Sequence, residues 1–94
     1  MGAFGSSALV LLTLSATGSA ALLDPVVLAA MYDLTPAETR VALAIHEGLV
    51  VKTIASRQRV TGDAIRYHVK NLFKKIGVRN QRELVLALQS VAFL

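Results

Sequence analysis

The stretch from Gly62 to Ile76 constrains the fold most strongly, because its apolar residues repeat with the period of an α-helix. At roughly 100° per residue, these apolar side chains fall within one stripe about 100° wide. They are Ile65, Val69, Leu72, Phe73 and Ile76. The sequence therefore predicts a helix over 62–76 that packs on the core of a mainly α domain.

The opposite side of the same predicted helix is basic and carries an aromatic ring. It collects Tyr67, Lys70, Asn71 and Lys74, with Arg66 beside them. In the major groove of DNA, Arg and Lys donate to guanine, Asn pairs with adenine, and an aromatic ring can contact a thymine methyl group. A solvated basic face gives the same pattern and is more common, so this helix alone leaves both interpretations open.

The composition excludes several classes of function. The 94 residues suffice for about one domain, and there is no cysteine for a disulfide, a thiolate metal site or a nucleophile. The two histidines, His46 and His68, are accompanied by no suggestive carboxylate pair and no Gly-rich phosphate loop. We therefore expect no enzyme activity and no cofactor, and the lack of cysteine favours a cytoplasmic protein.

Charge divides the chain into two parts. Residues 1–32 contain one charged residue, Asp24, whereas residues 33–94 contain all ten Lys and Arg residues and five of the six acids. Apolar residues make up 54% of the whole chain and charged residues only 17%. The basic second part predicts an anionic partner, of which nucleic acid is the commonest and an acidic membrane surface the next.

The apolar run Ala8–Leu14 predicts a short strand, because it has strand length and turn-forming residues on both sides. A lone strand cannot pair its own backbone, so we expect it to pair between chains, to complete another sheet, or to be disordered. The run is too short for a membrane helix, which needs about 20 residues. No Lys or Arg precedes it as in a signal peptide, and Met1-Gly2 with Ser6 fits the N-myristoylation pattern only loosely.

Two helices before the basic helix begin with clear N-terminal signals. Asp24-Pro25 starts a short connector helix that should end near Tyr32-Asp33. Thr35 and Glu38 form a capping box, and the helix that follows stops at Gly48, a suitable left-handed C-cap. The predicted core stripe of that helix consists of Val41, Ala44 and Ile45.

A helix-turn-helix is predicted where the chain enters the basic helix. The segment Lys52–Arg59 favours a shorter helix in which Ile54 and Ala55 are buried. Gly62 lets the chain turn, and Thr61 can cap the helix that follows. Two short helices joined by a tight turn are typical of this motif.

A final helix begins at Asn80, which can act as N-cap with Glu83 three residues later. Its predicted core stripe consists of Leu84, Leu88, Val91 and Ala92. Leu86 and Phe93 lie on the far side and give apolar surface that a monomer would not need. Single exposed apolar residues are common, but because these two are large and close together we expect them to contact a partner in a homodimer.

Several short motifs follow one another along residues 34–91. They are Leu34-Thr35-Pro36-x-Glu38, Glu47-Gly48-Leu49, Lys52-x-Ile54-Ala55, Val60-Thr61, Ile65-Arg66-x-His68, Leu72-Phe73-x-Lys75-x-Gly77-Val78 and Glu83-Leu84-Val85. Their order resembles the LuxR/GerE-type DNA-binding domain of bacterial transcription regulators. The resemblance implies a four-helix domain over 34–94 whose third helix reads the major groove and whose fourth helix often pairs two subunits.

The resemblance also implies roles for individual residues. The expected base-reading residues are Arg66, Tyr67 and Lys70. The residues that we assign to the DNA phosphates are Lys52, Thr61, His68 and Lys74. His68 lies at the edge of the predicted core stripe, so a packed or phosphate-contacting imidazole is favoured over a base reader.

Four positions depart from the family pattern. Val50-Val51 stands where the family commonly has Ser/Thr-Asn, whose side chains could cap the second helix or bond phosphate. Asp63 places an acid beside the reading helix, where it can either repel phosphate or accept a hydrogen bond from a cytosine amino group. Leu43 occupies a position that is usually polar. These departures bear on affinity and preferred sequence more than on the fold.

In this family an N-terminal sensor usually controls activity. Residues 1–33 leave room only for the last strand and connector of such a sensor. We therefore favour a C-terminal part of a larger regulator over a stand-alone effector, and we interpret residues 1–33 as a remnant of the sensor. The sequence thus predicts a dimeric, sequence-specific transcription regulator with no membrane association. The alternative is a helix-turn-helix module that docks an acidic protein such as RNA polymerase, and the apolar residues Leu43 and Val50-Val51 favour it.

Overall fold

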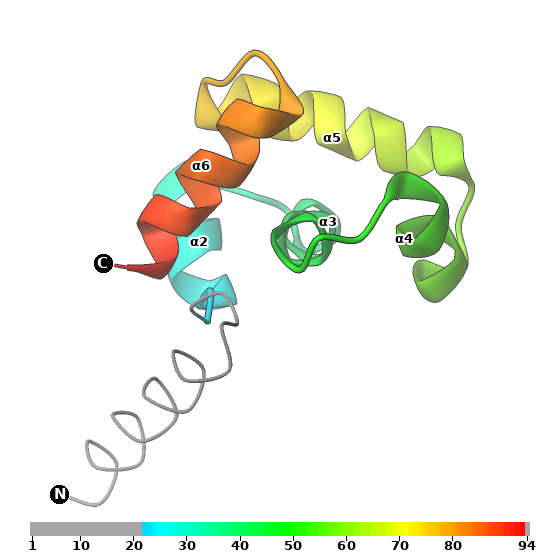
Figure 1. The fold of residues 1–94 in the computed structure, drawn as a ribbon, viewed down its shortest axis with the longest axis horizontal. Helices are drawn as coiled ribbons and strands as arrows, with labels where there is room; N and C mark the ends of the chain where they lie inside the picture. Colours follow the sequence, from blue (N-terminus) through cyan, green and yellow to red (C-terminus); the bar gives the residue numbers. More distant parts are fainter. Residues whose placement is uncertain (1–21, 94) are drawn as a thin grey trace, which may run out of the picture.

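The computed structural model describes residues 22–93, which form five helices and no strand (Figure 1). The helices are α2 (Pro25–Tyr32), α3 (Pro36–His46), α4 (Val51–Gln58), α5 (Gly62–Ile76) and α6 (Gln81–Ala92). The prediction of a mainly α, four-helix domain preceded by a connector helix is confirmed. The strand predicted over Ala8–Leu14 lies outside the described residues.

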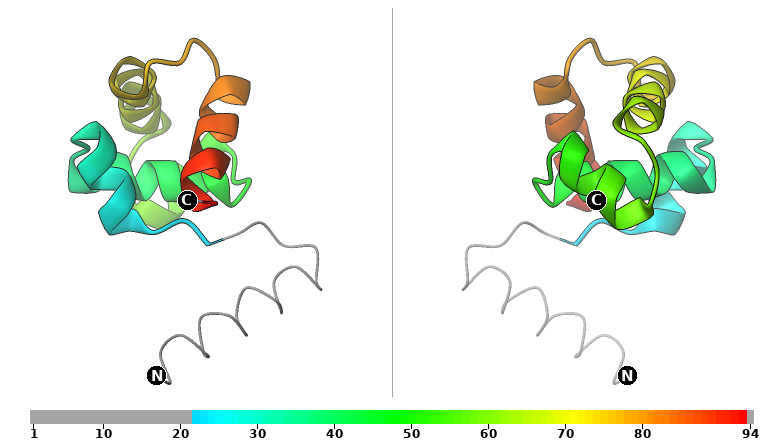
Figure 2. Two further views of the ribbon diagram at one scale, coloured as in Figure 1. Left: turned by 90° about the vertical axis from the view of Figure 1, so that its left-hand side faces the viewer. Right: turned by 90° about the vertical axis from the view of Figure 1, so that its right-hand side faces the viewer.

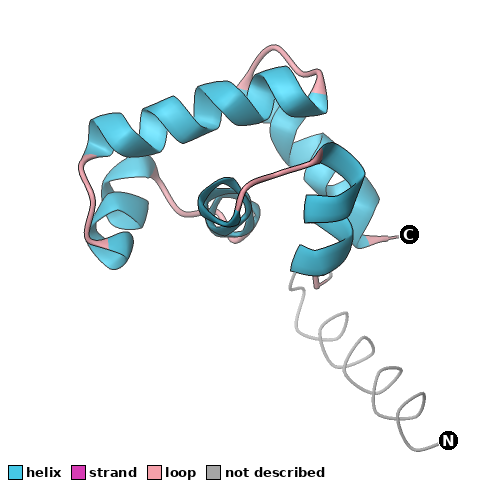
Figure 3. Cartoon of the chain, turned by 180° about the vertical axis from the view of Figure 1, so that it is seen from behind, coloured by secondary structure: helices cyan, strands magenta, loops and turns pink. Residues whose placement is uncertain are grey.

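Helix α3 lies at the centre of the domain. It contacts α2, α5 and α6, and it is seen end-on beneath the long α5 from the front and from behind (Figures 1 and 3). Helix α4 packs against α5 near the start of α5. At the other end of α5, a loop turns the chain into α6, which packs back against α3 (Figure 2). Helix α5 therefore spans the domain from α4 to α6.

One apolar cluster joins all five helices. Its fully enclosed side chains are Leu28, Val41, Ala42, Ile65, Leu72, Leu84 and Leu88, each 0% exposed. Ile54 of α4 is only 1% exposed and belongs to the same cluster. The predicted stripes of α5 and α6 face this core, whereas the fully buried alanine of α3 is Ala42 and the predicted Ala44 is half-buried.

The N-terminal caps of α3 and α6 differ in one hydrogen bond. At α3 the capping box is complete, because the Thr35 hydroxyl accepts from the N–H of Glu38 and the Glu38 carboxylate accepts from the N–H of Thr35. At α6 the Asn80 side chain accepts from the N–H of Glu83 as predicted. The Glu83 carboxylate, however, accepts from the N–H of Arg79, one residue before the cap.

The turn of the helix-turn-helix is made by Arg59, and the prediction that Gly62 makes it is wrong. Arg59 adopts the left-handed conformation, with φ 57° and ψ 44°, and so ends α4. The N–H of Val60 then donates to the carbonyl of Ala55 at 3.0 Å and closes the turn. Gly62 is the first residue of α5 and does not have a positive φ. The second helix is accordingly shifted by one residue from its predicted bounds.

Candidate nucleic-acid interface

Helix α5 is held at a fixed rotation by both of its ends and by its core face. Thr61 caps its N-terminus, because the hydroxyl accepts from the N–H of Ala64 at 3.1 Å. Gly77 ends the helix in the left-handed conformation, with φ 83°. Ile65 and Leu72 are fully buried between these ends. Together these contacts determine which side chains of α5 face outward.

The predicted base-reading residues come together on the outward face of α5. Arg66, Lys70 and Lys74 are exposed and stand four residues apart, so they lie on successive turns along about 12 Å of the helix. Tyr67 is 64% exposed and stands beside this row. Asn71, which the sequence pattern groups with them, is half-buried at the edge of the face.

The residues assigned to phosphate contacts surround this face. Lys52 is exposed on the first turn of α4, and Lys74 lies near the far end of α5. Thr61 is exposed at the start of α5, and its capping hydroxyl accepts a hydrogen bond while its own O–H stays available to donate. His68 is half-buried, and its ring meets that of Tyr67 edge-on, with centroids 5.7 Å apart and planes 64° apart. His68 is thus the most packed member of the group.

Arg59 is an exposed cation that the sequence analysis did not assign to the site. It lies in the turn between α4 and α5, where its left-handed backbone directs the chain from one helix to the next. Its position at the end of α4 was the only signal for it in the sequence. Arg57, two residues earlier in the chain, instead lies 4.0 Å from the Glu47 carboxylate.

Asp63 is the only acidic residue of α5 and lies in its first turn. Its side chain is 95% exposed, and its Oδ1 accepts from Nη1 of Arg66 at 3.0 Å. An exposed pair of this kind contributes little to folding stability. Its effect on the site is to place one negative charge at the N-terminal end of an otherwise basic face.

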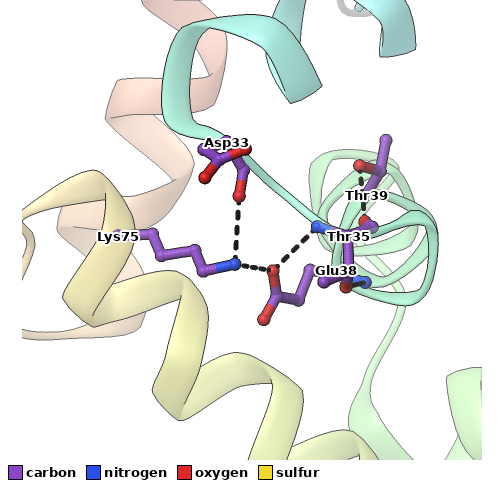
Figure 4. Close-up of polar contacts among 5 residues, drawn as sticks. All are labelled: Asp33, Thr35, Glu38, Thr39 and Lys75. Atoms are coloured by element: carbon purple, nitrogen blue, oxygen red, sulfur yellow. Dashed lines mark hydrogen bonds and ion pairs between the residues drawn. The ribbon is translucent and has the colours of Figure 1, made fainter.

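Lys75 belongs to the scaffold of the domain and not to the exposed row of cations. Its Nζ donates to Oε1 of Glu38 at 2.7 Å and to the carbonyl oxygen of Asp33 at 3.0 Å (Figure 4). The same Oε1 accepts from the N–H of Thr35 at 3.0 Å. This contact joins the last turn of α5 to the first turn of α3 and to the end of α2.

The Glu38 carboxylate is charged although it is 4% exposed. Burial by itself raises the pKa of this carboxyl group, but the hydrogen bonds from Lys75 and Thr35 and the charge of Lys75 outweigh that effect. The pKa of Glu38 therefore lies below its ordinary value. Of the four cations of α5, Lys75 neutralises this buried acid, and Arg66, Lys70 and Lys74 are left on the outer face.

The apolar residues that favour a protein-docking function lie outside α5. Leu43 lines a shallow groove between α2 and α3 together with Val26 and Ala29, with a volume of about 460 Å³. Val50 is 63% exposed just before α4. Neither residue is part of α5, so the basic face is distinct from both apolar features.

A comparison with known protein families settles the family of the domain. The model described as bacterial regulatory proteins, luxR family, matches residues 33–88, which is more than half of the chain. The chain belongs to this family. No curated protein and no solved structure matches it.

The luxR family consists of DNA-binding transcription regulators with a helix-turn-helix, which α4 and α5 form here. The matched residues include every residue that the sequence analysis assigned to DNA contacts, as well as Leu86. Phe93 and helix α2 lie outside the match. Within residues 22–93 of this luxR-family chain, no helix is both long and apolar enough to cross a membrane.

Proposed function

We propose that this luxR-family domain binds specific DNA sequences by placing α5 in the major groove. The observation that carries the proposal is the outward face of α5, where Arg66, Tyr67 and Lys70 are exposed side by side on a helix anchored by Ile65 and Leu72. The major groove is about 12 Å wide and admits an α-helix. A rigid helix with several donors on one face suits base reading, because its conformational entropy is already lost on folding and is not lost again on binding.

The side chains divide by chemistry into readers and anchors. Arg66 and Lys70 can donate to O6 and N7 of guanine, and Tyr67 offers a ring and a hydroxyl to base edges. Contacts to the DNA backbone come from the surrounding residues, which position the helix without reading sequence. These residues are Lys52, Thr61, His68 and Lys74. The position of Arg59 in the turn before α5 makes it a fifth candidate for a contact to the DNA backbone.

We also propose that the domain acts as a homodimer through α6. Leu86 is 55% exposed and Phe93 is 76% exposed. Leu86 lies on α6 and Phe93 is the C-cap residue that follows it, so the two stand seven residues, or about two turns, apart on one side of the helix. A symmetric dimer would present two copies of α5 to half-sites about one helical turn of DNA apart, roughly 34–36 Å. As a transcription regulator without a membrane role, the protein would act in the cytoplasm.

A titration of the chain with a pool of random duplex DNA tests the proposal. Fluorescence anisotropy is measured at two salt concentrations, and the bound duplexes are then recovered and sequenced. We expect affinity to fall with salt, since bound counterions are released, and we expect a palindromic sequence to be enriched. Absence of binding at low salt would contradict the proposal and favour docking of an acidic protein such as RNA polymerase.

A charge-matched control separates the α5 face from general basicity. Arg40 is an exposed cation of α3 that lines the α2–α3 groove. Arg40→Ala removes the same charge as Lys70→Ala, but it should leave the affinity for the selected sequence nearly unchanged. Equal losses for the two variants would show that net charge alone governs binding.

A further inference from the structure

The acidic residue beside the base-reading row is held in a defined contact. Asp63 lies one turn before Arg66 on α5, and its Oδ1 accepts from Nη1 of Arg66 at 3.0 Å. No other acid lies on α5, and none of the neighbouring α4 residues is acidic. The carboxylate therefore stands alone among cations at the end of the helix where a reading helix approaches the bases.

The Arg66 side chain folds back toward the start of α5 in this pair. A Cβ atom built at Gly62 would lie 3.3 Å from Nη1 of Arg66, so the guanidinium group occupies the space that the missing side chain leaves open. The Asp63 carboxylate and Gly62 together thus favour one placement of the guanidinium group. Without the carboxylate, Arg66 would be free to swing toward the nearest phosphate.

The pair leaves hydrogen-bonding capacity on both partners. Only one guanidinium nitrogen and one carboxylate oxygen take part, whereas a guanidinium group has five N–H donors and a carboxylate has two acceptor oxygens. The side chains of Asp63 and Arg66 are 95% and 67% exposed, so each can meet DNA without unfolding. The pair therefore presents a donor group next to an acceptor group.

The acceptor restricts which bases can stand opposite it. A carboxylate only accepts, so it is attracted to the N4 amino group of cytosine and repelled by O6 and N7 of guanine and by phosphate. Arg66 has the opposite preference, since it donates to O6 and N7 of guanine. A G·C base pair presents these two edges beside each other in the major groove.

We propose that Asp63 is a specificity-determining residue, which orients Arg66 toward guanine and selects the cytosine amino group at the same or the neighbouring base pair. The inference rests on the proposed function, because it requires α5 to lie in the major groove. It gives Asp63 two opposite effects on binding. The carboxylate weakens binding to DNA of any sequence by repelling phosphate, and it raises the preference for the G·C pair.

Substitution of Asp63 separates these two effects. Asp63→Ala is compared with Asp63→Asn, which keeps the size and the acceptor oxygen but loses the charge. Glu47→Ala removes one negative charge from an exposed side chain outside α5 and serves as the charge-matched control. Affinities are measured for random duplex DNA, for the sequence selected by the unmutated chain, and for that sequence with single base-pair changes.

We expect Asp63→Ala to bind random duplex DNA roughly twofold more tightly or better while losing about fivefold or more of its discrimination at one G·C pair. Asp63→Asn should keep part of that discrimination, and Glu47→Ala should keep all of it. A purely structural role in α5 would change the melting temperature but would not change the preference at a single base pair. Unchanged discrimination in Asp63→Ala would overturn the inference.

Failure of the proposed DNA-binding function can be distinguished from failure of the role proposed for Asp63. If the unmutated chain does not bind DNA at all, the proposed function fails, and the inference fails with it. If the unmutated chain selects a sequence and Asp63→Ala discriminates among its single base-pair variants equally well, only the role of Asp63 is wrong. Circular dichroism of each variant checks that α5 remains folded in both cases.

Discussion

Glu38 can stay charged inside the domain because two donors meet it there. The Nζ of Lys75 and the N–H of Thr35 both donate to its Oε1. Burial of a charged carboxylate without such partners is strongly unfavourable, because the charge loses its hydration. The contact between Lys75 and Glu38 therefore compensates the burial of this carboxylate and joins α5 to α3.

Lys75→Met tests the contribution of this pair to stability. The variant keeps much of the side-chain volume but leaves the Glu38 carboxylate with only the Thr35 donor. We expect the free energy of unfolding to fall by about 1–3 kcal/mol, as for other buried groups that lose a partner. Urea denaturation followed by circular dichroism measures the change. Lys74→Met is the matched control at the adjacent exposed lysine and should change stability by less than about 0.5 kcal/mol.

The depressed pKa of Glu38 also predicts a dependence of stability on pH. The folded-state pKa lies below the ordinary value of 4.5, so the folded state binds fewer protons than the unfolded state in this range. The contribution of Glu38 is fully present above pH 4.5 and is lost as the pH falls through the folded-state pKa. Thermal melting of the unmutated chain and of Glu38→Gln between pH 7 and pH 3 checks this. A Glu38→Gln chain with the same acid sensitivity would rule out Glu38 as a source of it.

Sequence reasoning finds local contacts of single residues but not distant ones. The capping box of Thr35 and Glu38 spans three residues and was visible in the sequence. The second hydrogen-bond donor to the Glu38 carboxylate is Lys75, which is 37 residues away in the sequence. Lys74 and Lys75 are adjacent and chemically identical, so only the rotation of α5 in the structure shows which of the two lysines pairs with the buried Glu38 carboxylate.

At the scale of the helices, four C-terminal ends share one backbone motif. After α2, α3, α4 and α5, a residue in the left-handed region is followed by an apolar residue whose N–H donates to a carbonyl five residues earlier. Glycine occupies the left-handed position at Gly48 and Gly77. Asp33 and Arg59 occupy it at the other two ends.

This difference explains why the turn after α4 was placed at the wrong residue. Glycine in a left-handed position is a sequence signal, because other residues are disfavoured there. The end of α3 was predicted from Gly48, whereas the turn after α4 was placed at Gly62 by the same reasoning. Arg59 carries no such signal, because its conformation is imposed by the packing of α4 and α5 on either side.

Helix α4 begins without a side-chain cap, and this predicts a stabilising substitution. Val50 is its N-cap residue, is 63% exposed and can accept no hydrogen bond through its side chain. Val50→Ser should raise the free energy of unfolding by about 0.5–2 kcal/mol, because serine can accept from the free N–H groups of the first turn. Val50→Ala, which cannot cap, is the control. Equal denaturation midpoints for the serine and alanine variants would contradict this account.

At the scale of the whole molecule, the two surfaces that we propose for DNA binding and for dimerisation lie on different helices. The basic row lies on α5, whereas the exposed apolar pair consists of Leu86 on α6 and Phe93, the C-cap residue directly after α6. Both surfaces could be predicted from helical periodicity, because each consists of residues excluded from a core stripe. Helical periodicity could not predict which side chains of α5 pair with each other, because the contact between Asp63 and Arg66 depends on side-chain conformation.

The apolar pair predicts the oligomeric state. Leu86→Glu combined with Phe93→Glu should leave a folded monomer, because charges on both sides of a symmetric contact face one another. Sedimentation equilibrium over a range of concentrations measures the state of each chain. Val26→Glu alters an equally exposed apolar residue of α2 and should leave the dimer intact. An unmutated chain that stays monomeric at high concentration would exclude the α6 dimer.

The central claim is that α5 reads bases, and the most direct test compares Tyr67→Ala with Lys52→Ala. Tyr67 carries no charge, so its loss should cost about 1–3 kcal/mol on the selected sequence and little on random DNA. Lys52 is proposed to contact a DNA phosphate, so its loss should weaken both complexes alike and reduce the salt slope by about one. Fluorescence anisotropy measures the affinity of each variant for the selected sequence and for random DNA, and the comparison tests whether Tyr67 reads bases. Equal losses for Tyr67→Ala on selected and random DNA would contradict base reading by α5.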